Sequence, residues 1–200
     1  MDVTMRLNHC LVFLALSCAS APLLAAECTL ANRDAVLALP LQVFDGDPDA
    51  GWRPLADRPG CVLETAELIA DYRRQQPAVA GDPPLVWREA QLRALGGERD
   101  PASALMRTTY KPKHADVGGW NAYVDATIAF LDDDLPALKQ ARARLAALPP
   151  PPGRVVRDGK VQVEAEQVPW PPRLPVVDAL VRCMYQPYAL AYEACPAASE

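Results

Sequence analysis

Residues 82–97 read DPPLVWREAQLRALGG, and this stretch shows how the chain is built. Pro83 and Pro84 follow Asp82, which suits the first turn of a helix. The pair Gly96-Gly97 ends the pattern, as glycine commonly does after the last helical turn. We therefore predict a helix between these signals. The apolar residues that recur within it are Leu85, Val86, Ala90, Leu92 and Leu95.

Similar helical patterns flank this stretch on both sides. We predict an amphipathic helix over residues 61–76, because apolar side chains recur at helical spacing and Pro77 follows. Asp134 is expected to cap a helix over residues 135–148. Pro40 interrupts residues 32–44, which predicts one kinked helix or two short ones. The remaining predicted helices cover residues 100–111 and 116–131, with a short helical turn at Trp52 and Leu55.

The pattern changes after the proline run at residues 149–152. Val155-Val156 and Val161-Gln162-Val163 flank Asp158-Gly159, which is typical of a β-hairpin. Two short helices, over residues 175–184 and 187–194, finish the chain. We expect residues 149–200 to form a proline-rich linker, a small β-hairpin and a helical pair. These would pack on the same domain as the helical hairpins of residues 27–148.

The first residues have the pattern of a signal peptide. Arg6 precedes the short apolar run at residues 10–16, and Leu24-Ala25-Ala26 suits signal peptidase. We predict a signal peptide over residues 1–26, cleaved near Ala26, and hence a periplasmic or secreted protein. A lipid anchor on Cys18 is an alternative that its flanking residues fit less well. No later stretch has enough consecutive apolar residues for a membrane span.

Removal of the signal peptide leaves an even number of cysteines. In an oxidising compartment, such a set favours disulfides. Three pairings are conceivable, and the one between sequence neighbours would tie each end of the chain to a nearby segment. Zinc is disfavoured, because no C-x-x-C motif occurs and His114 is the single histidine left. The cysteines concerned are Cys28, Cys61, Cys183 and Cys195.

Small residues recur at a nearly constant spacing along the helical region. Ala66, Ala102 and Ala137 are separated by 36 and 35 residues, and Pro77 and Pro149 follow the first and last of them by 11 and 12. Over residues 61–149 the pattern resembles the tetratricopeptide repeat, a helix–turn–helix unit of 34 residues. The Gly of that repeat's first helix is absent here. The segment 170–195 is also similar to the tails of exported proteobacterial proteins.

The resemblance implies stacked helical hairpins with a concave binding surface. Arg182 and Tyr192, near the chain end, could extend this face. Core packing of Trp87 and Trp120 at helix crossings is the favoured alternative to ligand stacking. The residues expected on the binding face are Trp87, Gln91, Trp120, Asn121 and Asp125.

Several functional classes find no support in the residues. A net charge of −5 gives no basic footprint for nucleic acid. Neither G-x-S-x-G nor a glycine-rich phosphate loop occurs. Asp132-Asp133-Asp134 lacks the ligand spacing of a calcium loop and is interpreted as a solvated turn. Glu164 and Glu166 are interpreted as the exposed face of the hairpin. No catalytic residue, metal or cofactor is therefore predicted.

The sequence as a whole predicts a mainly α protein with a role in binding. We expect an exported, non-enzymatic protein-binding or scaffold module of the bacterial periplasm, with a protein or peptide as partner. The alternative is an inhibitor or immunity-type protein that binds a secreted or envelope enzyme, because acidic proteins can meet basic enzymes through complementary charge.

Overall fold

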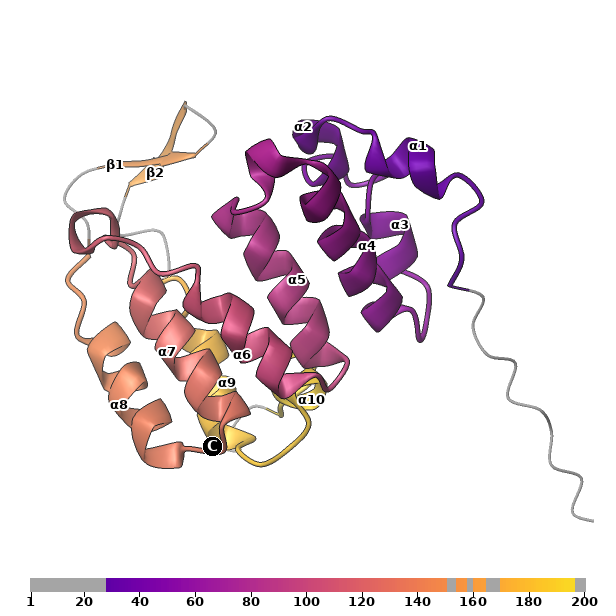
Figure 1. Ribbon diagram of the computed structural model, residues 1–200. Coiled ribbons are helices and arrows are strands. Elements are labelled where there is room, and N and C mark those ends of the chain that lie inside the picture. The colour runs from indigo at the N-terminus through magenta and orange to yellow at the C-terminus, as the bar shows by residue number, and fades with distance from the viewer. Residues whose placement is uncertain (1–27, 151–153, 158–159, 165–169, 197–200) are drawn as a thin grey trace, which may run out of the picture.

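The computed structural model describes residues 28–150, 154–157, 160–164 and 170–196, with side chains for 28–150 and 170–196. The signal peptide predicted for residues 1–26 lies outside this part. Within it the chain is mainly helical, with ten α-helices, so the predicted fold class is confirmed at this level (Figure 1). None of the described helices is both long and apolar enough to span a membrane.

Helices succeed one another along the chain, and two short strands lie between the eighth and the ninth helix. Pro40 separates two short helices, which decides between the alternatives left by the sequence. In chain order the elements are α1 Arg33–Leu37, α2 Leu41–Phe44, α3 Arg53–Ala56, α4 Val62–Gln75, α5 Pro83–Leu95, α6 Arg99–Arg107, α7 Trp120–Leu131, α8 Leu135–Ala146, α9 Leu174–Arg182 and α10 Tyr188–Glu193. Short 3-10 helices cover Pro77–Val79 and Lys113–Ala115.

Helix α5 lies between two hydrophobic cores and contributes side chains to both. Leu85 and Leu92, seven residues apart on one side of the helix, pack with α1 to α4. Trp87, Ala90 and Ala94 recur on another side and pack with α6 to α10. Figure 1 shows the result, with α1 to α4 at one end of the molecule and α7 and α8 at the other. The bulk of the protein thus assembles around α5.

Aspartates cap α5 and α8, and both of these helices carry proline in the first turn. The Asp82 side chain accepts a hydrogen bond from the Leu85 amide at 3.1 Å, at the start of α5. Asp134 accepts from the Ala137 amide at 2.9 Å, so the predicted cap of α8 is confirmed. Each cap satisfies a backbone N–H that has no partner inside its helix.

Helix α7 starts later than the sequence predicts. The expected start was residue 116, but the helix begins at Trp120. Gly119 adopts a left-handed conformation, with φ of 70°, and this breaks the helical path. A Cβ atom at Gly119 would lie 2.5 Å from a methyl carbon of Leu145 and 2.4 Å from one of Leu148. The glycine therefore also allows the close approach of α7 and α8.

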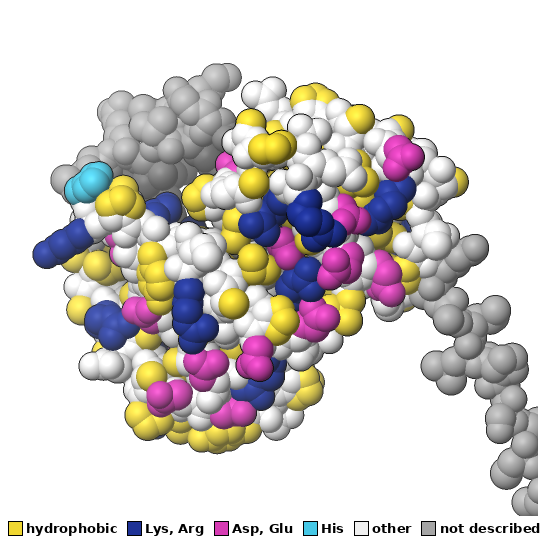
Figure 2. Space-filling view, viewed as in Figure 1, with side chains coloured by type: hydrophobic (Ala, Val, Ile, Leu, Met, Phe, Trp, Pro, Cys, Tyr) yellow, Lys and Arg dark blue, Asp and Glu magenta, His cyan; other side chains and the backbone are white. Residues whose placement is uncertain are grey.

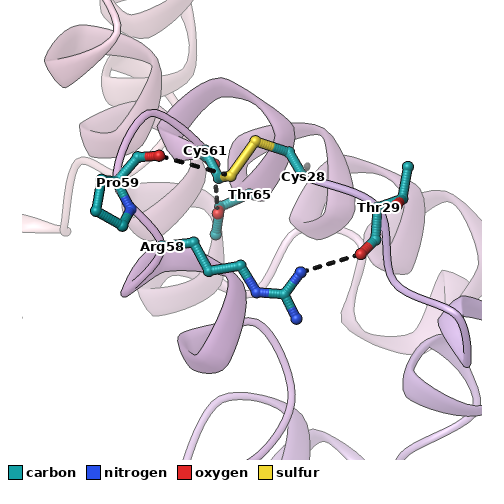
Figure 3. The surroundings of a disulfide bond; sticks show 6 residues. All are labelled: Cys28, Thr29, Arg58, Pro59, Cys61 and Thr65. Carbon is teal, nitrogen blue, oxygen red and sulfur yellow. Dashed lines mark hydrogen bonds between the residues drawn. A yellow bond between two sulfur atoms is a disulfide. The ribbon is translucent and has the colours of Figure 1, made fainter. Parts of the chain in front are cut away.

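Two disulfides join cysteines that are neighbours in sequence. Cys28 and Cys61 are bonded with Cα atoms 5.3 Å apart, and Cys183 and Cys195 with Cα atoms 6.0 Å apart. Figure 3 shows the first, which fastens the start of the described chain to the start of α4. Beside it, the Arg58 guanidinium donates to the carbonyl of Thr29 at 3.0 Å. The second ties the end of α9 to the segment after α10.

Two short strands follow the linker. β1 Arg154–Arg157 pairs antiparallel with β2 Lys160–Glu164, with an irregularity between Val155 and Val156. The predicted turn at Asp158-Gly159 and the residue Glu166 lie outside the described residues. A hairpin that packs on the helices therefore stays a prediction.

Candidate functional site

A pocket of about 420 Å³ lies between α5, α7, α9 and α10. Four of the side chains that line it are aromatic: Trp87, Trp120, Tyr123 and Tyr192. The rings of Trp87 and Trp120 meet edge to face, with centroids 4.6 Å apart, and the Tyr123 ring lies 5.2 Å from that of Trp87. Aromatic walls of this kind, with a few polar groups, are typical of ligand pockets.

Cationic side chains stand over the aromatic walls. The Arg173 guanidinium carbon lies 4.9 Å from the ring centroid of Trp120 and 5.6 Å from that of Tyr123. The Lys111 ammonium lies 5.5 Å from the ring of Trp120. Such cation–π contacts hold a cation in place without neutralising it. Arg88 also lines the pocket, but its guanidinium pairs with Asp45 at 3.2 Å.

The loop before α7 is fixed to this helix by side-chain hydrogen bonds. The Asn121 side chain accepts from the backbone amide of Lys111 and donates to its carbonyl, both at 2.8 Å. The indole N–H of Trp120 donates to the carbonyl of Thr109 at 2.8 Å. Asn121 and Trp120 thus position the backbone from which the Lys111 side chain reaches the pocket.

Tyr188 is buried beside the pocket without lining it. Among the described residues its hydroxyl has no hydrogen bond of normal geometry. Burial raises the pKa of Tyr188 well above its usual value, and the nearby Tyr123 and Tyr192 act in the same direction. Burial likewise raises the pKa of Tyr123, helped by Tyr192. These tyrosines therefore stay neutral, as hydroxyl groups, at neutral pH.

The structure brings part of the predicted binding face together. Trp87, Gln91 and Trp120 line one pocket, and Tyr192 joins them from α10. Trp87 is only 6% exposed, so it serves the core and the pocket wall at once.

The other predicted residues have other contacts. Asn121 holds the loop of Lys111. The Asp125 carboxylate accepts hydrogen bonds from the Tyr110 hydroxyl and, at 2.6 Å, from Arg144. Arg182 donates to the carbonyl of Pro196 at 3.1 Å. Asp125 and Arg182 thus do not line the pocket.

Sequence reasoning missed the residues that give the pocket its charge. Arg173 precedes α9. The helix predicted over residues 100–111 ends at Arg107, so Lys111 lies in the loop before α7. Tyr123 is not among the residues predicted for the binding face. The contact of Arg173 with the rings of Trp120 and Tyr123 is found only when the C-terminal segment is placed on α7.

A cluster of charged side chains, separate from the pocket, joins α4 to α5. Glu89 is 3% exposed, and its carboxylate accepts hydrogen bonds from Arg73 and, at 2.9 Å, from Arg93. Arg93 also pairs with Glu67 at 2.8 Å and with Glu98 at 2.6 Å. Burial alone would lower the pKa of Arg93, but the hydrogen bonds to these carboxylates raise it overall. With its charges mutually satisfied, the cluster has the features of a structural network.

Charge is otherwise mixed on the surface. Figure 2 shows basic and acidic side chains next to one another on the face in view. No group of three or more His, Cys, Asp or Glu side chains within the described part is arranged to hold a metal ion.

The chain matches no protein-family model, no curated protein sequence and no solved structure.

Proposed function

We propose that this protein is an exported, non-enzymatic binding module that accepts a segment of a partner protein in the aromatic pocket. The observation that carries the proposal is the pocket itself. Trp87, Trp120, Tyr123 and Tyr192 come from three helices and surround a space of about 420 Å³. Tryptophan, tyrosine and arginine are the residues that most often dominate binding energy at protein interfaces.

The two disulfides support the exported location. Disulfides persist in oxidising compartments and are rare in the cytosol, so the pairs Cys28–Cys61 and Cys183–Cys195 are consistent with an extracellular or periplasmic protein. The signal peptide expected over residues 1–26 agrees with this location.

A tetratricopeptide-like stacking of the helices belongs to the same proposal. Ala66 and Ala102 are fully buried, as expected for small residues where helices cross closely. Met106 and Ala141, four residues after the second and third small residues, are buried as well. In such an arrangement the pocket would lie where the C-terminal helical pair covers the stacked hairpins.

The proposal can be tested by affinity capture with matched variants. Residues 27–200 carrying an affinity tag are exported to the periplasm of the native host, cross-linked and purified. Tyr192→Ala removes a pocket wall, whereas Leu190→Ala alters an exposed side chain of the same helix that does not line the pocket. A partner that is retained by wild type and Leu190→Ala but lost with Tyr192→Ala supports the proposal. A partner that both variants retain contradicts the assignment to the pocket.

A further inference from the structure

We infer that the partner segment is acidic, with an Asp or Glu side chain next to an apolar one that enters the aromatic pocket. The inference rests on the proposed function and adds the chemistry of the partner. It follows from the charge of the pocket, from the unused hydrogen-bonding capacity of Arg173 and from the apolar surface beside it.

The pocket is cationic in a protein of net charge −5. Arg88, Lys111 and Arg173 line it, and no Asp or Glu does. Arg88 forms an ion pair with Asp45, which also pairs with Arg53. Within the described residues, neither Lys111 nor Arg173 forms an ion pair, although most arginines there do. Two positive charges therefore face the pocket without a counter-charge from the described part of the chain.

Arg173 is held in an orientation that suits a carboxylate. Its guanidinium stands over the rings of Trp120 and Tyr123, and its N–H groups donate no hydrogen bond to the part of the protein that is described. A planar guanidinium that is stacked on a ring keeps its edge free for two parallel hydrogen bonds to a carboxylate. Because the side chain is already ordered by stacking, little further rotamer freedom is lost on binding.

The rest of the pocket suits an apolar side chain. Pro83, Pro84 and Val176 complete the lining beside the aromatic rings. Aromatic and apolar walls bury a hydrophobic group favourably, and the polar groups around them fix its orientation. A peptide with a carboxylate next to an aromatic or aliphatic residue therefore matches both parts of the pocket.

A cationic ligand fits the same pocket less well. Several aromatic rings together can also hold a cation. Here, however, Arg173 and Lys111 already stand over the Trp120 ring and would repel a third positive charge. Like charges brought together at an interface are unfavourable and suppress wrong partners. The charges therefore favour an anion over a cation.

Blocked tripeptides provide the direct test. Acetyl-Glu-Phe-Glu-amide, acetyl-Gln-Phe-Gln-amide and acetyl-Lys-Phe-Lys-amide are titrated into the protein by calorimetry at low and at high salt. We expect the acidic peptide to bind about tenfold more tightly than the neutral one, and to lose this advantage as salt screens the charges. The basic peptide should bind least tightly.

Two arginine variants locate the effect. With Arg173→Gln, the affinity for the acidic peptide should fall about tenfold while that for the neutral peptide stays the same, because a charged hydrogen bond is lost and the apolar contacts remain. Arg182→Gln, at the far end of α9 and outside the pocket, should change neither affinity. Circular dichroism confirms that both variants are folded.

Other outcomes separate the failure of this inference from that of the proposed function. Equal affinities for the acidic and neutral peptides would overturn the acidic specificity and leave peptide binding intact. If no peptide binds but phenylacetate does, in a manner that depends on Arg173, the pocket takes a small aromatic anion, and both proposals fail. If neither the peptides nor phenylacetate binds, the pocket is not a binding site, and both proposals fail again.

Discussion

The guanidinium of Arg173 lies 4.9 Å from the ring centroid of Trp120 and so links the segment before α9 to the start of α7. Trp120 in turn meets Trp87 of α5 edge to face. These contacts form a continuous series from the C-terminal segment through α7 to the central helix α5. The shape and charge of the pocket therefore depend on how the end of the chain docks on α5 and α7.

Replacement of Trp120 by leucine should weaken ligand binding and stability together. The change removes the ring under Arg173 and the hydrogen bond to the carbonyl of Thr109. We expect affinity for the acidic peptide to fall about tenfold and the free energy of unfolding to fall by about 2–3 kcal/mol. Calorimetric titration and urea unfolding measure the two effects.

Trp52→Leu is a matched control for this prediction. Trp52 is also half-buried, its indole N–H donates to Asp45 at 2.9 Å, and the Arg53 guanidinium lies 4.5 Å from its ring centroid. It belongs to the other core and does not line the pocket. Its loss should destabilise the protein to a similar degree and leave peptide affinity unchanged. A similar loss of affinity in both variants would mean that general destabilisation, not the pocket, controls binding.

Gly119→Ala should destabilise the protein by about 2–4 kcal/mol. The cost combines a left-handed backbone, unfavourable by about 1–2 kcal/mol for any residue with a Cβ, with overpacking against the buried Leu145. Gly97→Ala measures the cost of the left-handed backbone without the overpacking, because Gly97 has φ of 88° but no atom within 4 Å of the added Cβ. Gly81→Ala, without strain or contact, should be nearly neutral. In thermal unfolding, Gly119→Ala should lose the most stability, Gly97→Ala less and Gly81→Ala almost none.

The helices were predictable because local signals mark them. The start of α8 is marked by Asp134 and Pro136, and the start of α2 is marked by Pro40. Each of these signals lies at the helix boundary itself and needs no tertiary contact. The start of α7 was not predictable, because Gly119 is left-handed for a reason of tertiary packing, namely the approach of Leu145 and Leu148.

The pocket was predictable only in part. Trp87 and Gln91 lie one turn apart on a single helix, so the sequence places them together. Arg173 reaches them from a distant segment, and no periodicity predicts its position. The disulfide pairing also depends on how the ends of the chain dock, which spacing alone does not determine among three pairings.

Glu89→Ala should be strongly destabilising. Glu89 is nearly inaccessible and neutralises Arg73 and Arg93, whose side chains are 19% and 12% exposed. Removing one member of a buried charge cluster leaves the others uncompensated, and we expect a loss of about 3 kcal/mol in chemical unfolding. Glu64→Ala, an exposed glutamate on α4 without an ion pair in the described residues, should change stability by less than about 0.5 kcal/mol. Similar losses for both variants would contradict a special role for the cluster.

Stability should decline as pH rises above 10. Partial desolvation, together with the hydrogen bond to Asp125, raises the pKa of Tyr110 to about 12, and burial raises the pKa values of Tyr123 and Tyr188 as well. The unfolded chain loses these phenolic protons near pH 10, before the folded protein does, so the stabilisation is complete below pH 10 and is lost as pH rises through the folded values. Urea unfolding at several pH values measures the decline. Tyr110→Phe should make it shallower between pH 10 and about 12, and an unchanged slope would contradict the assignment.

The two disulfides should differ in what their loss does to the pocket. Cys183 and Cys195 close a short loop that contains α10, and this helix carries Tyr192 of the pocket wall and the buried Tyr188. Loop entropy predicts that Cys183→Ala with Cys195→Ala costs about 3 kcal/mol of stability. Because α10 is then held by packing alone, we also expect affinity for the acidic peptide to fall by about three- to tenfold, roughly 0.7–1.4 kcal/mol.

The other disulfide supplies the control for this last prediction. Cys28→Ala with Cys61→Ala opens a longer loop and should cost about 4 kcal/mol. This bond lies at the opposite core, so as long as the protein remains folded its loss should leave the pocket affinity unchanged. The double variant at Cys183 and Cys195 would thus lose less stability than the one at Cys28 and Cys61, yet lose more binding affinity. If affinity instead follows stability in both double variants, the C-terminal disulfide has no specific part in shaping the pocket.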